Sequence, residues 1–309
     1  MLVIEAANLS KVYPSRRGFF GTSFEIERGE IIGFLGPNGS GKSTLLKVLA
    51  TCLRPTSGAF RVLGLNGLVP TPALRQRLGV LFEGVAHFGD LSGFDNAWFF
   101  AMSYGLEPRL AGARLEELFL WAGLNDYKDS RVKTYSYGMK RKLALVEALA
   151  HHPDVLLLDE PSLGLDYVST VALYQRLADL ASTGTTVVLA TNNVFEAEKL
   201  CSRVALIDQG RLVALDSPLN LLKTQQDCQH ITVTLAEPIA QDVLSGVPMV
   251  RGVVGAEQNT LQIVVSDAEA ALPEVVTAVV QARGRIVSLK VSEPNLGDVF
   301  IAMTGAKVS

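Results

Sequence analysis

The most informative stretch of this sequence reads Gly36-Pro37-Asn38-Gly39-Ser40-Gly41-Lys42-Ser43-Thr44. It follows an apolar run, Ile31–Leu35, and opens a helical pattern, Lys42–Leu53. Glycines allow backbone N–H groups to curl around phosphate oxygens, and the start of the helix adds positive charge. The sequence therefore predicts an α/β protein with a phosphate-binding loop, in which Lys42 reaches the β- and γ-phosphates and Ser43 meets Mg²⁺.

Two acidic residues follow a second apolar run, Val155–Leu158. Sheets of α/β proteins bind ligands at the carboxyl ends of their strands. We expect Asp159 to hold Mg²⁺, directly or through water, and Glu160 to activate water as a general base. An exposed acidic turn would be the alternative if these acids stood alone, but the phosphate loop upstream favours the catalytic interpretation.

Short apolar runs alternate with helical patterns from residue 1 to about residue 224, which is typical of an α/β domain. Beside those already named, the predicted strands are Val80–Phe82, Val187–Thr191 and Val204–Ile207, and the predicted helices are Met139–Ala150 and Val168–Ala181. Between about residues 91 and 134 two helical patterns, Asp95–Tyr104 and Ala111–Ala122, occur with no strand between them. This break predicts an inserted helical subdomain.

A polar segment, Lys223–Asp227, is a predicted linker to a second domain, residues 225–309. Its predicted strands are Ile231–Leu235, Leu261–Val265 and Ile286–Val291, with a helix at Glu274–Ala282, which makes it a small α+β domain. It has no glycine loop, paired acids or Cys/His group. We therefore expect it to serve dimerisation or regulation and to hold no catalytic residue.

Composition excludes several classes of function. A formal net charge of -3 and a pI near 5.9 give no basic footprint for nucleic acid. No apolar run is long enough to cross a bilayer, and the first residues lack the pattern of a secretory signal, so we expect a cytosolic protein.

Cysteine and histidine positions favour structural roles. Cys52, Cys201 and Cys228 have no paired spacing, which predicts buried thiols in a reducing compartment. His151 and His152 end a predicted helix, where a cation stabilises the terminal carbonyl groups.

The segment between the two phosphate-site motifs identifies a family. Tyr135-Ser136-Tyr137-Gly138-Met139, followed by a helix and the Asp159-Glu160 pair, resembles the signature and Walker B block of ABC transporter ATPases. The usual signature there is Leu-Ser-Gly-Gly-Gln, of which Ser136 and Gly138 remain. The form resembles the exporter branch with ABC-2-type membrane partners, and Pro294–Gly305 looks like the end of the accessory domain in that branch.

This resemblance covers roughly residues 1–224 and implies the P-loop NTPase fold of the ABC ATPase type, with ATP and Mg²⁺ as cofactors. It implies a head-to-tail dimer in which Lys42 of one subunit and Ser136 of the other enclose each nucleotide. Tyr13 matches the aromatic residue that stacks on adenine, although a strand-end core aromatic is the alternative. Asp166 matches the loop that communicates across the dimer. The implied nucleotide-binding residues are Tyr13, Gly36, Pro37, Asn38, Gly39, Ser40, Gly41, Lys42, Ser43, Thr44, Ser136 and Gly138.

Two positions depart from the family pattern. Glu83 stands at the usual glutamine, and its carboxylate can meet Mg²⁺ and the attacking water as an amide oxygen would. Asn192 stands at the usual histidine, and it keeps a neutral donor but loses a positive charge. With Glu160 retained, these changes predict a slow but real ATPase.

The resemblance also implies partners and a location. We expect a transmembrane permease subunit, a second ATPase subunit that is the same or a different chain, no nucleic acid, and a peripheral position on the cytoplasmic face of the membrane. The helical subdomain and the cleft near Glu83 would dock the permease. Its aromatic residues either line that face or pack in the core; these are Trp98, Phe99, Phe100 and Tyr104.

Two other functions compete with a transport motor. One is a regulatory or structural ATP-binding subunit with little turnover, which the changes at positions 83 and 192 favour and Glu160 opposes. The other is an ABC protein acting on ribosomes or DNA, which the acidic pI and the single ATPase domain oppose.

Overall fold

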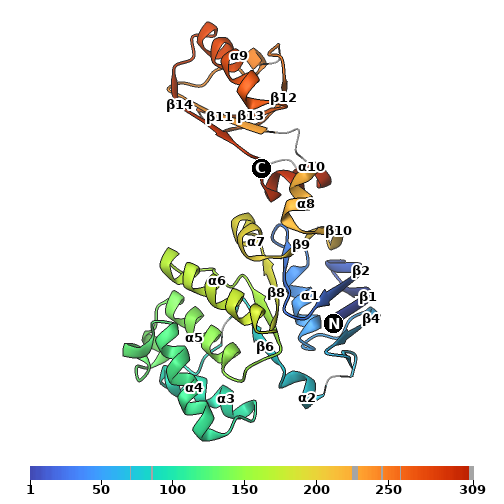
Figure 1. Cartoon of the computed structure of the whole chain (residues 1–309), viewed down its shortest axis with the longest axis vertical. Helices are drawn as coiled ribbons and strands as arrows, with labels where there is room; N and C mark the ends of the chain where they lie inside the picture. The colour runs from blue at the N-terminus through green and yellow to red at the C-terminus, as the bar shows by residue number, and fades with distance from the viewer. Residues whose placement is uncertain (70, 85, 225–228, 245, 258, 306–309) are drawn as a thin grey trace. The chain divides into compact units, whose positions relative to one another are not determined.

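The computed structural model describes residues 1–69, 71–84, 86–224, 229–244, 246–257 and 259–305 (Figure 1). Their contacts form two compact units, residues 1–216 and 217–309. The boundary expected from the sequence lay after residue 224, and most of the linker expected there, residues 225–228, lies outside the described residues. Helix α8 (Pro218–Lys223) groups with the second unit because it packs on α10 (Leu296–Thr304).

A six-stranded sheet forms the centre of the first unit, with five parallel strands and one antiparallel edge strand. Its order is β10 (Arg211–Asp216), β9 (Arg203–Asp208), β3 (Ile31–Leu35), β8 (Thr186–Thr191), β7 (Val155–Asp159) and β6 (Leu78–Leu81). Every residue of β3, β7 and β8 is buried. Continuous apolar runs therefore identified these strands in the sequence, since helices and a second sheet cover both faces.

A second, antiparallel sheet belongs to the same unit and was not predicted. Its order is β2 (Gly18–Glu27), β1 (Leu2–Val12), β4 (Ser57–Val62) and β5 (Leu65–Asn66). Buried and exposed residues alternate along β2, because one face of the sheet packs on the core. The core cluster joins residues of both sheets with α1 (Lys42–Leu49), which lies between them in Figure 1.

Helices cover the central sheet and build the insertion. Helices α2 (Pro72–Arg75), α5 (Tyr137–Leu149), α6 (Tyr167–Ser182) and α7 (Val194–Leu200) surround the strands, while α3 (Gly93–Ser103), α4 (Pro108–Trp121) and two 3₁₀ turns, η1 (Asn125–Tyr127) and η2 (Val132–Thr134), form the helical subdomain. Ser92 and Asp95 make a capping box at the start of α3. A bridge between Ser92 and Arg131 ties the two ends of the insertion together, so it is a compact outgrowth of the core.

The second unit is a four-stranded antiparallel sheet with helices. The strand order is β12 (Val250–Glu257), β13 (Thr260–Val265), β11 (Gln229–Leu235) and β14 (Ile286–Ser292); α9 (Ala268–Gln281) and a 3₁₀ turn, η3 (Gln241–Leu244), pack with the sheet. Strand β12 was not predicted, because Gly252 and Gly255 interrupt its apolar pattern. Its own apolar cluster gives this unit a separate core.

The structure contradicts two roles that the sequence predicted for single residues, the helix-capping cation at His151 and the buried thiol at Cys52. The imidazole of His151 is buried and lies face to face with Tyr104, and burial lowers the pKa of His151 to about 4, so it is no helix-capping cation. Cys52 is exposed, contrary to the prediction, whereas Cys201 is buried, and Cys228 lies outside the described residues.

In the described part of the chain, every helix is too short or too polar to cross a lipid bilayer.

Candidate functional site

The predicted phosphate loop leads from β3 into α1 and depends on its glycines. Gly39 and Gly41 have φ of 80° and 101°, a conformation that side chains disfavour. A Cβ atom at Gly36 would lie 2.1 Å from the carbonyl oxygen of Ile207, and one at Gly41 would lie 2.6 Å from that of Gly18. Close backbone packing behind the loop therefore fixes its curved shape and leaves its amide groups on the open side.

Lys42 lies inside this loop. Its side chain is buried, and Nζ donates hydrogen bonds to the carbonyl oxygens of Gly36 (2.7 Å) and Pro37 (3.0 Å). Burial lowers the pKa of Lys42, and the carboxylates of Glu160, Asp159 and Glu83 oppose that shift. The ammonium group is thus held among carbonyl oxygens and acids, and only backbone contacts must break for it to meet a phosphate.

Ser43 and Asp159 come together as predicted for a metal site. The Ser43 hydroxyl donates to Asp159 Oδ1 at 3.0 Å, and Asp159 is almost completely buried. Burial raises the pKa of Asp159, the hydrogen bond from Ser43 opposes the shift, and Glu83 adds to it. Hydroxyl and carboxylate oxygens are the ligands that Mg²⁺ prefers, so these residues fit that ion.

Glu160 occupies an uncommon backbone conformation at the end of β7. Its φ is 48°, and its N–H donates to the carbonyl oxygen of Ala190 at 2.8 Å. The Thr191 hydroxyl donates to Glu160 Oε2 at 3.4 Å. Burial raises the pKa of Glu160, whereas Lys42 opposes the shift. Left-handed geometry is uncommon at a non-glycine residue, and Glu160 combines it with a side chain that lines a cavity.

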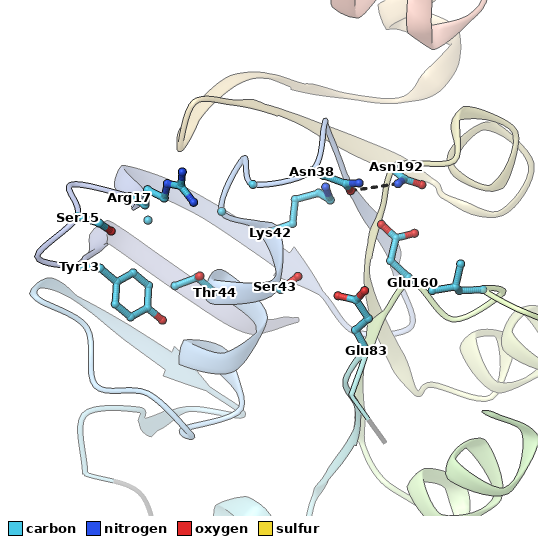
Figure 2. Close-up of a pocket in the computed structure, with 14 residues that line it drawn as sticks. Tyr13, Ser15, Arg17, Asn38, Lys42, Ser43, Thr44, Glu83, Glu160 and Asn192 are labelled. Atoms are coloured by element: carbon cyan, nitrogen blue, oxygen red, sulfur yellow. Dashed lines mark hydrogen bonds between the residues drawn. The ribbon is translucent and has the colours of Figure 1, made fainter. Parts of the chain in front are cut away.

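Lys42, Ser43 and Glu160 line one cavity of about 650 Å³, and Asp159 lies behind Ser43, with which it forms a hydrogen bond. Figure 2 shows Glu83 and Glu160 approaching from one side and the loop with Lys42 and Ser43 from the other. Tyr13 lies at the far end, more than a third exposed, with Lys11 Nζ 5.7 Å from its ring centre, so it is not a core residue. The fourteen lining residues are Tyr13, Ser15, Arg17, Gly18, Asn38, Gly39, Gly41, Lys42, Ser43, Thr44, Glu83, Glu160, Leu163 and Asn192.

Asn192 closes one side of the cavity. Its Nδ2 donates to Asn38 Oδ1 at 3.2 Å and so links the loop after β8 to the phosphate loop (Figure 2). The bond uses one hydrogen of the neutral amide donor that the sequence analysis noted at this position.

Ser136, Gly138 and Asp166 do not belong to the fourteen lining residues. Ser136 caps α5 by accepting from the N–H of Met139 at 3.2 Å, and Asp166 caps α6 by accepting from that of Ser169 at 2.8 Å. A Cβ atom on Gly138 would lie 2.8 Å from the carbonyl oxygen of Gly164. One chain therefore places these predicted residues around two neighbouring helix starts and apart from its own cavity.

Sequence reasoning missed Arg141, which organises the acids. The guanidinium is buried in α5 and donates to the carbonyl oxygens of Phe82 (2.8 Å), Asp159 and Glu160 (2.6 Å). It thereby ties together the ends of β6 and β7. No signal in the sequence distinguished Arg141, because it stands between Lys140 and Lys142 near the start of α5. Ser15, Arg17 and Leu163 of the cavity lining were missed as well, because they lie in loops without a motif.

Two family models match the chain. The model described as "ABC transporter" matches residues 19–163, and the one described as "ATP-binding protein DrrA1-3-like, C-terminal domain" matches residues 218–304.

Relatives match over nearly the whole length. The daunorubicin resistance ATP-binding protein DrrA3 of Streptomyces coeruleorubidus is 34% identical, over 96% of this chain and 93% of its own. The linearmycin resistance ATP-binding protein LnrL of Bacillus subtilis (strain 168) is 30% identical, over 98% of both chains. A Nod factor export ATP-binding protein I of Burkholderia orbicola (strain AU 1054) is 34% identical, over 99% of this chain and 98% of its own.

Solved structures agree with the fold. One described as an ATP binding subunit of an ABC transporter superposes with a TM-score of 0.68 at 27% identity, covering 72% of this chain and 92% of that chain. A dimeric, post-hydrolysis ATP-binding cassette, MJ0796, gives 0.64 at 22% identity over 69% of this chain and 98% of its own, and this likeness concerns the fold alone. The fold class predicted from the sequence is confirmed.

Proposed function

Because the chain belongs to the ATP-binding proteins of the ABC transporter family, we propose that the cavity between Lys42 and Glu160 is where it hydrolyses ATP to drive a membrane partner. The chain is an ATP-binding subunit of an ABC transporter and an ATPase. The observation that carries the assignment of the site is the meeting of the glycine loop, the Ser43–Asp159 contact and Glu160 around one cavity.

Each residue has a distinct task in this proposal. Lys42 exchanges its carbonyl partners for the β- and γ-phosphates, and the N–H groups of Gly39 and of residues 41–44 at the start of α1 bind the remaining oxygens. Glu160 accepts a proton from the attacking water, while Arg141 fixes the backbone that aims it. Tyr13 stacks on the adenine at the far end of the cavity.

Ser43, Asp159 and Glu83 would hold Mg²⁺, which neutralises charge on the phosphates when it is bound. Thr44, Glu83 and Asn192 complete the lining around the phosphates. Asn192 must exchange its bond to Asn38 for one to the nucleotide, or act through Asn38.

A second ATPase subunit completes the site in this proposal. Ser136 and Gly138 lie at the start of α5, where unpaired helix amides suit an anion, but away from the cavity of their own chain. The surface near them is apolar and exposed, with Tyr137, Leu163 and Tyr167 at 54%, 44% and 81% exposure. A head-to-tail partner would cover this surface and bring its own Ser136 to the nucleotide, with Asp166 at the contact.

The membrane partner docks on the helical subdomain in our proposal. Trp98 stacks on Phe94 and Tyr104 on His151, so these two aromatics serve packing. Phe88 and Phe99 are about half exposed and form an edge-to-face pair with ring centres 5.1 Å apart. This exposed pair suits an apolar helix end of a permease subunit at the cytoplasmic face of the membrane. The names of the relatives, which concern drug resistance and Nod factor export, favour export.

Purification from detergent-solubilised membranes tests this function. We expect a tagged chain to bring down an integral membrane protein, and a Phe88→Ser/Phe99→Ser variant to lose it while binding ATP normally. Leu110→Ser, at another exposed apolar position, is the matched control. Recovery of ribosomes or of the chain alone, with no membrane protein in any detergent, would contradict the proposal.

A further inference from the structure

A buried contact joins α5 to the loop that follows β6. The side chains of His87 and Glu147 are 3% and 10% exposed, and His87 Nδ1 lies 3.2 Å from Glu147 Oε1. The other ring nitrogen, Nε2, lies 3.1 Å from the carbonyl oxygen of Lys140. His87 belongs to the loop between β6 and α3, whereas Lys140 and Glu147 belong to α5.

The geometry fixes how many protons the pair holds. A backbone carbonyl only accepts, so Nε2 must carry a hydrogen. The Nδ1–Oε1 contact also needs a hydrogen, either on the ring or on the carboxyl group. A neutral ring with an ionised Glu147 supplies one hydrogen for two contacts. To make both contacts, the pair must therefore hold one proton more than a neutral His87 ring and an ionised Glu147 hold together.

The pair lies where it can position the reacting groups. Four residues before His87, Glu83 lines the nucleotide cavity, and α5 begins at Ser136 and Gly138. The next residue, Phe88, is held by Asn96, whose buried side chain accepts from the Phe88 N–H (2.8 Å) and donates to its carbonyl oxygen (3.1 Å). The loop is thus fastened to α5 through His87 and to α3 through Phe88.

We propose that His87 and Glu147, sharing one proton, are positioning residues that hold the Glu83 loop against α5 for ATP hydrolysis. Loss of the shared proton removes the hydrogen bond between His87 and Glu147. This inference rests on the proposed function, because Glu83 is assigned there to the metal and water.

Neighbouring groups do not supply or remove this proton near neutral pH. Burial raises the pKa of Glu147, and the contact with His87 opposes that shift. Tyr104, at the end of α3, lines a cavity with Glu147, and burial raises the pKa of both Tyr104 and Cys52 beside it. Arg141, a buried charged group on the same helix, is engaged with the carbonyl oxygens at the strand ends.

The decisive variant is Glu147→Gln. Its amide donates to Nδ1 of a neutral ring, and Nε2–H still donates to Lys140, so both contacts survive without the extra proton. We expect wild-type kcat to fall between pH 7 and 9.5 and Glu147→Gln to fall less. Lys42, whose pKa is lowered by burial, affects both proteins equally. Glu147→Ala and His87→Ala should lose roughly 10- to 100-fold in kcat across the range, with the KM for ATP unchanged.

A second measurement does not depend on turnover. The chain has two tryptophans, Trp98 and Trp121, on helices of the subdomain, so their fluorescence follows unfolding of the first unit in urea. With a shared proton, the folded pair holds one proton more than the unfolded chain at a pH above about 6.5, where a free histidine is neutral. The unfolding constant of wild type should therefore grow with pH, by up to about tenfold per unit relative to Glu147→Gln.

The outcomes separate the two proposals. The shared proton would be refuted if kcat fell equally with rising pH in wild type and Glu147→Gln and if the urea midpoints of the two proteins changed with pH in parallel. Full activity in Glu147→Ala would overturn the positioning role. A folded wild type without ATPase activity at any pH would instead refute the proposed function, and the urea comparison would still decide the state of the pair.

Discussion

The Ser43 hydroxyl donates a 3.0 Å hydrogen bond to Asp159 Oδ1, across 116 residues of sequence. Ser43 is the second residue of α1 and Asp159 is the last residue of β7, so the bond joins the start of the helix after the phosphate loop to the strand that precedes Glu160. Asp159 is nearly inaccessible to water, and the Ser43 hydroxyl is the side-chain donor that its carboxylate accepts from among the described residues. A buried carboxylate with so few partners is costly unless a cation joins it, which agrees with a role in holding Mg²⁺.

Turnover should fall as pH falls, and the decrease should begin at a higher pH than carboxyl groups of ordinary pKa would give. Burial raises the pKa of both Asp159 and Glu160, and each must be ionised to bind a cation or accept a proton. As pH drops, protonation of these groups therefore begins above the usual range of about 4. The measurement is kcat/KM from pH 8 down to 4.5, with circular dichroism at each point. Constant activity over this range in folded protein would contradict the assignment.

Replacing Asn192 by histidine should raise kcat. Asn192 now donates to Asn38, and its neutral amide adds no charge near the phosphates. One charge-stabilising contact is worth about 10² in rate, which sets the upper limit of the gain. Steady-state hydrolysis by wild type beside Asn192→His measures it, with Asn192→Ala to show the effect of losing the bond to Asn38. Fast wild-type turnover that falls with histidine would show that asparagine is no defect.

Gly138→Ala should reduce turnover without weakening ATP binding to the isolated chain. The added Cβ would lie 2.8 Å from the carbonyl oxygen of Gly164, so the start of α5 must shift. Misplacing a contact supplied across a dimer costs roughly 10- to 100-fold in rate. Gly112→Ala is the control, because its Cβ meets Trp98 at an ordinary 3.8 Å. Normal turnover in Gly138→Ala would show that this close approach is unimportant.

Strands could be predicted from the sequence where all their residues are buried, because such strands read as continuous apolar runs. Strands β3, β7 and β8 were identified because every residue along them is buried. The antiparallel sheet of the first unit was missed, since its half-buried strands alternate apolar and polar residues with irregular register, as between Ala6 and Leu9 of β1. Strand β12 was missed for its glycines.

The residues of the site also divide into those that a local motif predicted and those that depend on contacts with distant parts of the sequence. Motifs of fixed spacing located Lys42 and Glu160, which the structure brings to one cavity. Arg141 could not be assigned, because its role depends on three carbonyl oxygens at the ends of two separate strands. His87 likewise has partners 53 and 60 residues away, at Lys140 and Glu147, and no local pattern records such contacts.

A chain ending at Asp216 should bind ATP as the full chain does. The first unit contains the whole cavity lining and has its own core, and residues 217–309 contribute none of the fourteen lining residues. Calorimetric titration of both proteins with ATP and Mg²⁺ compares their affinities. A well-folded truncated chain that fails to bind ATP would show that the second unit takes part in the site.

Glu160→Gln tests the central claim most directly, because glutamine keeps the shape of the side chain but cannot accept the proton from water. We expect kcat to fall by about 10²–10⁴ while ATP affinity is retained and an ATP-bound dimer accumulates. Glu25→Gln, at an exposed position of strand β2, should behave as wild type. The deciding measurement is phosphate release by the purified variant, with size-exclusion chromatography in ATP. Loss of hydrolysis with a trapped dimer is the predicted result, and hydrolysis at the wild-type rate would remove Glu160 from the mechanism.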